Sequence, residues 1–350
     1  MNVEYEPIPP RKSSPQKAKQ LKKTKKKRPL LRIFLLLFVG ILLLAGAGAG
    51  YVLHKSSEAL GQIGSLGNLI GKVTASESVK VKPTAIVLMG LDKRPAGVKG
   101  GGLNTDVMMV ASLNPKTKKV VVVSLPRDSK LSAKGYKARK ANAFYAAFYM
   151  NAKNKKLPQE EAELAGMSAV RDVLGELFGI DIKYSAIIDF KGFTDVVDAL
   201  GGIEVDVDMR MVYSDSYDGT NINLEKGRQI VKGKEALDFV RYRQSKDGKN
   251  MSSDFDRNRR QGEVVGAIFD KAMSFGGMMK IGSLIDAVGN NMKMDMPESE
   301  IKNMLSTYYN VKRSDITFIT VAGTWKSPYV YLNNDSVKEA SDALKANMAE

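Results

Sequence analysis

The most prominent hydropathy feature of the chain is an apolar stretch near its N-terminus. Residues 33–53 contain no charged side chain, and 33–39 are all Ile, Leu, Phe or Val. At about 1.5 Å per helical residue, this stretch is long enough to cross a hydrocarbon core of roughly 30 Å. The basic cluster from Lys22 to Arg28 precedes it, and such clusters stay on the cytoplasmic side. We therefore predict one transmembrane helix over residues 30–54.

Two polar segments flank this predicted helix. Residues 1–29 carry ten Lys or Arg against two Glu, so 10 − 2 gives +8 of the chain's net charge of +16. With few apolar side chains, this segment is expected to be a disordered cytoplasmic tail. Residues 55–82 are rich in Gly and Ser and are predicted to form a juxtamembrane stalk. The remainder, 83–350, is then an extracytoplasmic domain, and the protein a single-pass protein of the cell membrane.

Two other interpretations of the N-terminal region are open to the sequence. The small residues Ala45-Gly46-Ala47 suit a signal-peptidase site, although the apolar region is long for a signal peptide. Basic tails also occur in proteins that bind nucleic acid. The positive-inside effect and attraction to anionic lipids account for the tail more simply. We expect a membrane partner and no nucleic-acid partner.

Three short apolar runs mark the start of the main domain. Residues 85–89, 107–113 and 120–125 are rich in β-branched side chains and bounded by turn residues, which is typical of strands. Residues 114–118, Asn-Pro-Lys-Thr-Lys, form a tight connection, so the last two runs are predicted to be antiparallel. Apolar residues occupy both alternating faces, which predicts that helices cover both sides of the sheet.

Helical periodicity dominates the region that follows. A pattern that opens at Pro158 and closes at Gly179 predicts one helix. Apolar residues at i, i+3, i+4 and i+7 from Phe193 to Leu200 predict a second. The other predicted elements are strands at 184–190, 203–207 and 316–321, and helices at 234–239, 256–275, 280–290, 297–310 and 335–348. The predicted fold class is α/β, with a mixed central β-sheet sandwiched between helical layers.

Composition excludes several kinds of site. The chain has no cysteine, which excludes disulfides, thiolate metal sites and cysteine nucleophiles. Its one histidine, His54, lies at the edge of the predicted membrane segment. Catalytic triads and metal sites built on histidine are therefore excluded as well.

Charged residues gather at the ends of the first three predicted strands. If these strands form an antiparallel meander, Asp92, Asp106 and Arg127 lie at the same edge of the sheet. Two carboxylates beside a guanidinium suit a magnesium ion bound to a phosphate, because Mg²⁺ combines one or two carboxylates with phosphate oxygens. Alternatively, the two aspartates only cap turns.

A second group of charged residues consists mainly of arginines. Arg241 and Arg243 are two residues apart and share a face only in an extended segment, so the preceding helix should end near Phe239. Arg257 and Gln261 share a face if their segment is helical. Arginine matches phosphate oxygens with two parallel hydrogen bonds. The alternative is a solvated basic helix face.

The order of these motifs resembles the LytR-CpsA-Psr family of cell-wall glycopolymer ligases. The resemblance spans roughly residues 83–275, and each motif alone would be weak. The matching stretches are 86–94 (Ile-Val-Leu-Met-Gly-Leu-Asp-Lys-Arg), Thr105-Asp106, 124–128 (Ser-Leu-Pro-Arg-Asp), 140–143 (Lys-Ala-Asn-Ala), Gly201-Gly202-Ile203, 236–243 (Ala-Leu-Asp-Phe-Val-Arg-Tyr-Arg) and Asp256-Arg257 with Arg260-Gln261.

The resemblance implies a role for each matching position. Asp92 and Asp106 resemble the acids that coordinate magnesium, which makes Mg²⁺ the expected cofactor. The residues that resemble pyrophosphate ligands are Arg127, Lys140, Arg241, Arg243, Arg257 and Gln261. Among all of these, Asp92, Asp106, Arg127 and Arg241 are the expected catalytic residues.

The family implies a substrate pair and a reaction. Its members take a glycopolymer from a polyprenyl-pyrophosphate carrier and join it to peptidoglycan through a phosphodiester. A hydrophobic cavity between the sheet and the helices holds the polyprenyl chain. The acceptor hydroxyl must lose a proton, and either Asp106 or Asp128 is a candidate base; Asp128 has the alternative role of orienting Arg127.

Two departures from the family pattern leave substrate preference open. Asn104 stands where an arginine is common, and residues 144–151 replace a segment that often contains Gly-Gly. Two other functions compete with the ligase. A phosphatase would use water instead of a sugar hydroxyl, and a non-catalytic receptor would bind the lipid without turnover.

Overall fold

The structure is a computed structural model that describes residues 57–70, 73–91, 102–216, 220–245, 247–252, 254–272, 281–289, 291–308 and 311–349. No helix within these ranges combines the length and the apolar character needed to cross a bilayer. The predicted tail, 1–29, and transmembrane helix, 30–54, lie outside the described residues, so both stay predictions.

A six-stranded mixed sheet forms the centre of the domain. Its strands in spatial order are β11 (Met292–Met294), β6 (Tyr184–Asp189), β1 (Thr84–Leu91), β2 (Thr105–Leu113), β3 (Val120–Ser124) and β12 (Ile316–Thr320). The first three strands in sequence form the predicted antiparallel meander. β6 runs parallel to β1, and β12 runs parallel to β3. The carboxyl ends of β1, β3, β6 and β12 therefore lie at one edge.

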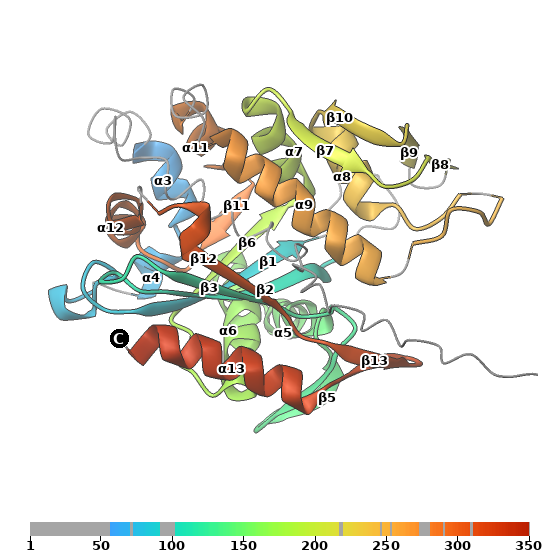
Figure 1. The fold of residues 1–350 in the computed structure, drawn as a ribbon. Helices are drawn as coiled ribbons and strands as arrows, with labels where there is room; N and C mark the ends of the chain where they lie inside the picture. The colour runs from blue at the N-terminus through green and yellow to red at the C-terminus, as the bar shows by residue number, and fades with distance from the viewer. Residues whose placement is uncertain are drawn as a thin grey trace, which may run out of the picture.

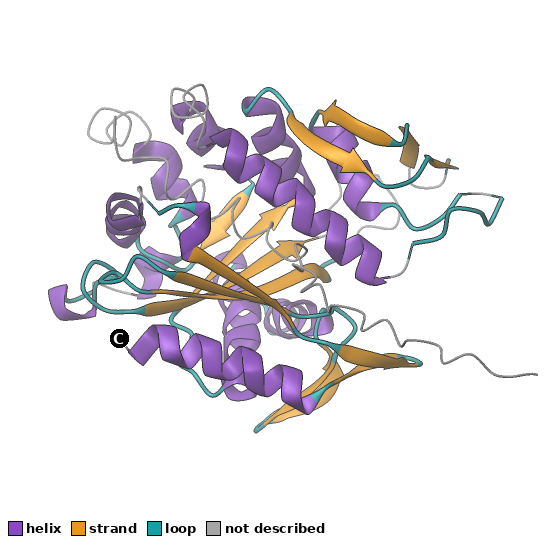
Figure 2. Cartoon of the chain, viewed as in Figure 1, coloured by secondary structure: helices purple, strands orange, loops and turns teal. Residues whose placement is uncertain are grey.

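Alternating side chains of the central strands pack into two separate cores. Ile86 and Leu88 of β1 belong to the core above the sheet in the view of Figure 1, while Val87 and Met89 belong to the core below. Every residue of β1 is buried. Figure 2 shows helices on both faces of the sheet, as predicted from the two-sided apolar pattern. Each buried side chain of this size contributes about 1.5–3 kcal/mol.

The layer below the sheet contains three helices, which are α5 (Ala143–Asn154), α6 (Gln159–Phe178) and α13 (Asn334–Ala349). α6 follows Pro158 and ends at Gly179, as predicted. Gly179 has a φ of 62°, a left-handed conformation that glycine adopts without steric cost.

The layer above the sheet contains most of the other helices and two small β-ribbons. Its helices are α3 (Ser57–Ile63), α7 (Phe190–Ala199), α8 (Gly233–Arg241), α9 (Asp254–Ala272), α11 (Ile281–Gly289) and α12 (Glu298–Tyr308). The ribbons pair β7 (Ile203–Val207) with β10 (Gly227–Val231), and β8 (Met211–Asp215) with β9 (Thr220–Leu224). The remaining elements are α4 (Gly67–Ile70), η1 (Ala75–Glu77), η2 (Arg313–Asp315), and the hairpins β4 (Lys130–Ala133) with β5 (Tyr136–Lys140) and β13 (Gly323–Lys326) with β14 (Tyr329–Leu332).

The segment expected to be a stalk, 55–82, differs from that expectation in its described part. Ile63 of α3 and Val79 are buried in the core above the sheet. Val79 N donates a hydrogen bond to the buried Glu300 Oε2 of α12 at 2.8 Å. The described part of the segment therefore packs as part of the domain, because its apolar side chains Leu60, Ile63 and Val79 belong to the core above the sheet.

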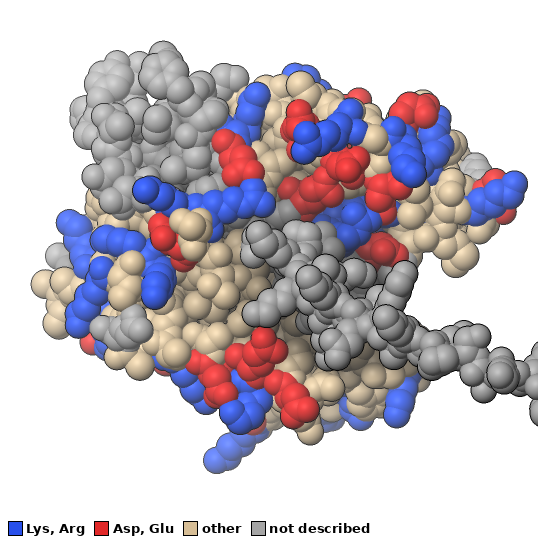
Figure 3. Space-filling view, in the orientation of Figure 1, with Lys and Arg blue, Asp and Glu red and all other residues tan. Residues whose placement is uncertain are grey.

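Positive and negative side chains are interspersed over the described part of the face drawn in Figure 3. Basic side chains gather mainly on the left of that view, at the end of the domain where the β2–β3 turn lies.

Candidate active site

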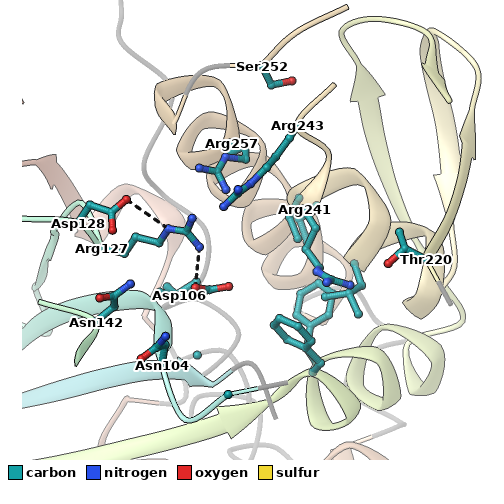
Figure 4. Close-up of a pocket in the computed structure, with 18 of the residues that line it drawn as sticks. Asn104, Asp106, Arg127, Asp128, Asn142, Thr220, Arg241, Arg243, Ser252 and Arg257 are labelled. Atoms are coloured by element: carbon teal, nitrogen blue, oxygen red, sulfur yellow. Dashed lines mark hydrogen bonds and ion pairs between the residues drawn. The ribbon is translucent and has the colours of Figure 1, made fainter. Parts of the chain in front are cut away.

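A cavity of about 930 Å³ lies at the edge where the four strands end. Asp106 at the start of β2, Arg127 after β3 and Asp189 at the end of β6 all line it. β2 runs antiparallel to β1 and β3, so its first residues lie beside the last residues of its neighbours. This topology brings Asp106 and Arg127 together, as the sequence predicted (Figure 4).

A chain of ion pairs connects the charged groups at this edge. Arg127 Nη1 donates a hydrogen bond to Asp106 Oδ1 at 2.7 Å, and Arg127 Nε lies 3.9 Å from Asp128 Oδ2. Lys140 Nζ lies 3.0 Å from Asp128 Oδ1. All four side chains keep some exposure. Asp106, Arg127 and Asp128 line the cavity, whereas Lys140 is not among its lining residues and is joined to it through Asp128. Asp106 is the nearer partner of Arg127, and Asp128 links Arg127 to Lys140.

Two more arginines add positive charge beside this chain. Burial, followed by the charges of Arg243 and Arg127, lowers the pKa of Arg257 to about 9. Partial desolvation, followed by the charge of Arg127, also lowers the pKa of Arg243. The carboxylates of Asp106 and Asp128 act in the opposite direction and do not cancel the effect. Burial is thus the main cause of both lowered pKa values, and repulsion between neighbouring guanidinium groups adds to it.

Arg241 lies apart from the other three arginines. Figure 4 shows Arg243 and Arg257 directed toward each other, while Arg241 is directed toward apolar side chains. The Arg241 guanidinium lies 4.9 Å from the centre of the Phe190 ring, which is a cation–π geometry. Arg241 lines the cavity, but at its apolar side rather than beside Asp106.

The end of α8 differs from the prediction. We expected the helix to stop near Phe239, but it continues to Arg241, and Tyr242 is the capping residue. Only Arg243 lies in the extended segment. The helix extends further because buried Phe239 and Val240 anchor its last turn, and this turn sends Arg241 and Arg243 in different directions.

The arginines of α9 divide into two roles. Arg257 lines the cavity, whereas Arg260 is completely buried and faces away from it. Arg260 Nε donates to Asp208 Oδ1 at 2.8 Å, and Nη2 donates to Asp208 Oδ2 at 3.0 Å. Arg259 also pairs with Asp208. Arg259 and Arg260 therefore fasten α9 to the chain after β7.

Beyond the charged groups, the cavity has an apolar wall between the sheet and the upper helices. This wall is built from Val107 of β2, Ile188 of β6, Phe193 of α7, Leu237 of α8, Val240 of α8 and Val264 of α9. The family resemblance implied such a wall, while the sequence alone did not distinguish a cavity from a filled core. In this protein, one cavity joins a cationic end to an apolar body.

Of the two aspartates predicted to bind magnesium, the structure describes Asp106. Within the described ranges, no three His, Cys, Asp or Glu side chains cluster as metal ligands. Asp92 lies outside these ranges; Gln261 belongs to α9, but its side chain lies outside the described part. Asp106 is partly exposed to the cavity, and its described hydrogen bonding engages only Oδ1. A carboxylate with a second oxygen open to the cavity fits a magnesium ion that also binds phosphate.

Sequence reasoning missed several residues that line the cavity. Asp189 caps α7 by accepting a hydrogen bond from Gly192 N at 2.9 Å, and its place at a strand end was a usable signal. Asn142 belongs to a quoted motif but received no role. Trp325 follows β12, and no pattern around it indicated chemistry; its being the only tryptophan was the one available sign.

Comparisons with known proteins agree with this architecture. TagU of Bacillus subtilis (strain 168), named a polyisoprenyl-teichoic acid--peptidoglycan teichoic acid transferase, is 29% identical over 293 residues, which cover 83% of this chain and 85% of that protein. TagU of Oceanobacillus iheyensis, which has the same descriptive name, is 25% identical over 272 residues, or 76% of each chain.

Solved structures share the fold. The crystal structure of B. subtilis TagV has a TM-score of 0.59 at 24% identity and covers 77% of this chain and 99% of that chain. A Streptococcus agalactiae protein has a TM-score of 0.60 at 25% identity, with coverage of 77% and 89%. The LytR_cpsA_psr family profile matches residues 57–349, which is most of the sequence. The chain belongs to the LytR-CpsA-Psr family.

Proposed function

We propose that this protein transfers a glycopolymer from a polyprenyl-pyrophosphate carrier onto peptidoglycan and forms a phosphodiester. The observation that carries the proposal is the single cavity in which a cluster of arginines meets an apolar wall. A polyprenyl pyrophosphate has the same two parts, an anionic head and an apolar chain. The names of the relatives describe this kind of transfer, in their case of teichoic acid.

The anionic head of the carrier fits the cationic end of the cavity. Arg127, Arg243 and Arg257 present guanidinium groups whose mutual repulsion a pyrophosphate would relieve. Arginine binds phosphate oxygens through paired hydrogen bonds, and such bonds gain strength away from bulk water. Arg241, beside Phe190, lies where the first isoprene units would begin. Lys140 supports Asp128 and adds charge at the opposite side.

Asp92 and Asp106 are the proposed holders of a magnesium ion. Bound there, Mg²⁺ would neutralise charge on the pyrophosphate oxygens. The protein's own part is to position this ion's carboxylate ligands, and Arg127 does so for Asp106 through its 2.7 Å hydrogen bond. Gln261 stays a proposed pyrophosphate ligand.

The proposed reaction is a displacement at the phosphorus that carries the glycopolymer. An acceptor sugar hydroxyl forms a bond to this phosphorus, and the bond between phosphorus and the bridging oxygen breaks. Polyprenyl phosphate leaves with that oxygen, and the hydroxyl proton passes to a carboxylate at the sheet edge, Asp106 or Asp128. The arginines hold both phosphates, so that the attacking and leaving oxygens stay in line.

The membrane topology belongs to the same proposal. The apolar segment 30–54 would anchor the chain with its basic tail in the cytoplasm and the domain outside. A lipid carrier and the cell wall are then both within reach. Anchoring also raises the local concentration of the domain at the surface that holds the lipid.

The lipid bound by the purified protein tests the donor part of this proposal. The full chain is purified from membranes in mild detergent, and its extracted lipids are identified by mass spectrometry. We expect a polyprenyl phosphate or pyrophosphate in the parent and its depletion in an Arg127→Ala, Arg243→Ala double variant. Arg228→Ala is the matched control, because Arg228 lies on β10 with its side chain 79% exposed and does not line the cavity. Equal lipid content in the parent and the double variant would contradict the assignment.

A further inference from the structure

The only tryptophan of the chain, Trp325, lies at the rim of the cavity and is 52% exposed. It belongs to β13, which follows the sheet strand β12. A tryptophan usually gains several kcal/mol by burial, roughly in proportion to its large apolar area. A half-exposed ring that lines the cavity beside a row of ion pairs is available to contact a ligand there.

The β-hairpin of Trp325 is joined to the loop that carries the charged groups. Val330 lies opposite Trp325 in the β13–β14 register. Val330 N donates a hydrogen bond to Asp128 O at 2.9 Å, and Val330 forms a parallel bridge with Ser129. The backbone of Trp325 and the Arg127–Asp128 segment thus belong to one hydrogen-bonded unit, which fixes where the indole side chain starts relative to the site.

Polar groups lie close to the indole ring. Lys140 Nζ lies 5.7 Å from the centre of the Trp325 ring and 3.0 Å from Asp128 Oδ1. An aromatic face attracts the weakly positive C–H bonds on one side of a pyranose ring, because the face carries partial negative charge. The sugar's hydroxyls then need donors and acceptors at its edge, which Lys140 and Asp128 supply. This composition suits a saccharide better than a lipid chain.

The geometry of the transfer reaction indicates whether a saccharide beside Trp325 belongs to the donor or to the acceptor. In-line displacement places the attacking and leaving oxygens on opposite sides of the phosphorus. The leaving polyprenyl phosphate belongs to the apolar wall, where Phe193, Leu237 and Val264 come from the upper helices. The attacking hydroxyl must then approach from the other side, where Asp128 and Trp325 lie.

We propose that Trp325, together with Lys140 and Asp128, binds a pyranose ring of the acceptor glycan and presents its hydroxyl to the phosphorus. This inference rests on the proposed transfer function and adds the acceptor subsite to it. It gives a role to the C-terminal part of the chain, for which the sequence offered none.

A single tryptophan makes direct binding measurable without labels. The full chain in detergent is titrated with soluble un-cross-linked peptidoglycan oligosaccharides, and the intrinsic fluorescence of Trp325 is followed. We expect a saturable change, with maltooligosaccharides of equal length as the control ligand. No saturable change with peptidoglycan oligosaccharides would overturn the subsite, whether or not transfer occurs.

Transfer kinetics provide the second readout. Trp325→Ala is expected to raise the acceptor KM by about tenfold, which corresponds to about 1.4 kcal/mol, and to leave carrier-lipid affinity unchanged. Trp325→Phe should restore most of the acceptor affinity because it keeps an aromatic face. Tyr331→Ala is the matched control: Tyr331 is 42% exposed on the same hairpin, pairs with Thr324 and does not line the cavity.

The outcomes separate this inference from the proposed function. Transfer with an unchanged acceptor KM in Trp325→Ala would refute the subsite and leave the transferase standing. Saturable fluorescence binding without any transfer would refute the transferase and leave a saccharide site. A loss of carrier affinity in Trp325→Ala would instead assign the ring to the donor and overturn the inference.

Discussion

At the scale of single residues, the cavity holds three guanidinium groups, of Arg127, Arg243 and Arg257, that repel one another. Arg257 illustrates the cost, since burial and the charges of Arg243 and Arg127 lower its pKa to about 9. A fold gains nothing from such an arrangement, because buried like charges destabilise it. In a binding site, like charges destabilise the unliganded protein, and a ligand of opposite charge offsets this destabilisation when it binds. Removing the charge of Arg257 should therefore stabilise the unliganded fold and weaken the binding of an anionic ligand.

Replacing Arg257 with methionine tests this opposition. Methionine keeps much of the side-chain volume and removes the charge. We expect the unliganded protein to gain about 0.5–2 kcal/mol in free energy of unfolding, as for other relieved functional sites. The same variant should lose carrier-lipid binding. Thermal unfolding and lipid-binding titrations check both parts; a variant that is destabilised and still binds the lipid would contradict the assignment.

The pKa of Arg257 also predicts a pH dependence. The folded-state pKa lies below the ordinary value of 12.5, so the stability penalty is fully present below about pH 9 and is relieved as the pH rises from 9 towards 12.5. Anion binding follows the opposite trend, because it needs the cation. We expect affinity for a polyprenyl phosphate to weaken above about pH 9, by at most about tenfold per unit. Arg257→Met should bind weakly at every pH, without this transition.

At the scale of elements, α9 carries one arginine that lines the cavity and, one turn later, another that attaches the helix to the rest of the domain. Arg257 faces the cavity, while Arg260 is buried against Asp208 of the chain after β7. Arg260 Nη1 also donates to Ser252 Oγ at 2.7 Å, which ties down the segment before the helix. The position of Arg257 in the cavity thus depends on the contacts of Arg260.

Arg260→Met should therefore lower the free energy of unfolding of the domain. Breaking a buried ion pair costs about 3–5 kcal/mol, and we expect about 2–4 because Arg259 still pairs with Asp208. Arg259→Met is the matched control and should cost about 1 kcal/mol or less, since its side chain keeps 25% exposure. Chemical denaturation compares the two. Equal losses in both variants would show that Arg260 does not have this fastening role.

Some helices and strands could be predicted from the sequence and others could not. The meander and the helix α6 follow from long apolar patterns with clear turn and cap residues. The hairpins β4–β5 and β13–β14 were not predicted, because most residues of their short strands are exposed or half-buried and no strand has a continuous apolar face. Asp106 and Arg127 were brought together by strand direction alone, whereas Trp325 and Asp189 required the parallel pairing of β12 and β6, which no local pattern reveals.

At the scale of the whole molecule, the two helical layers have different functions. The lower layer fills its side of the sheet with a packed core. The upper layer leaves the cavity between the sheet and α7, α8 and α9. Leu60, Ile63 and Val79 pack into the core of this upper layer, on the side of the sheet that would hold the lipid, and the proposed membrane anchor precedes them in the sequence. That boundary escaped sequence reasoning because Gly and Ser dominate the segment.

Acceptor-dependent transfer distinguishes a ligase from a phosphatase and from a lipid receptor, and a reconstituted assay measures it. The full chain in detergent receives a labelled glycan on polyprenyl pyrophosphate, magnesium and un-cross-linked peptidoglycan, with the Arg127→Ala, Arg243→Ala variant as the control. We predict that label joins peptidoglycan through a phosphodiester and that polyprenyl phosphate is released, only when the acceptor is present. Release of the glycan phosphate at the same rate without peptidoglycan would identify a phosphatase, and lipid binding without any release would identify a receptor; either result would contradict the transferase.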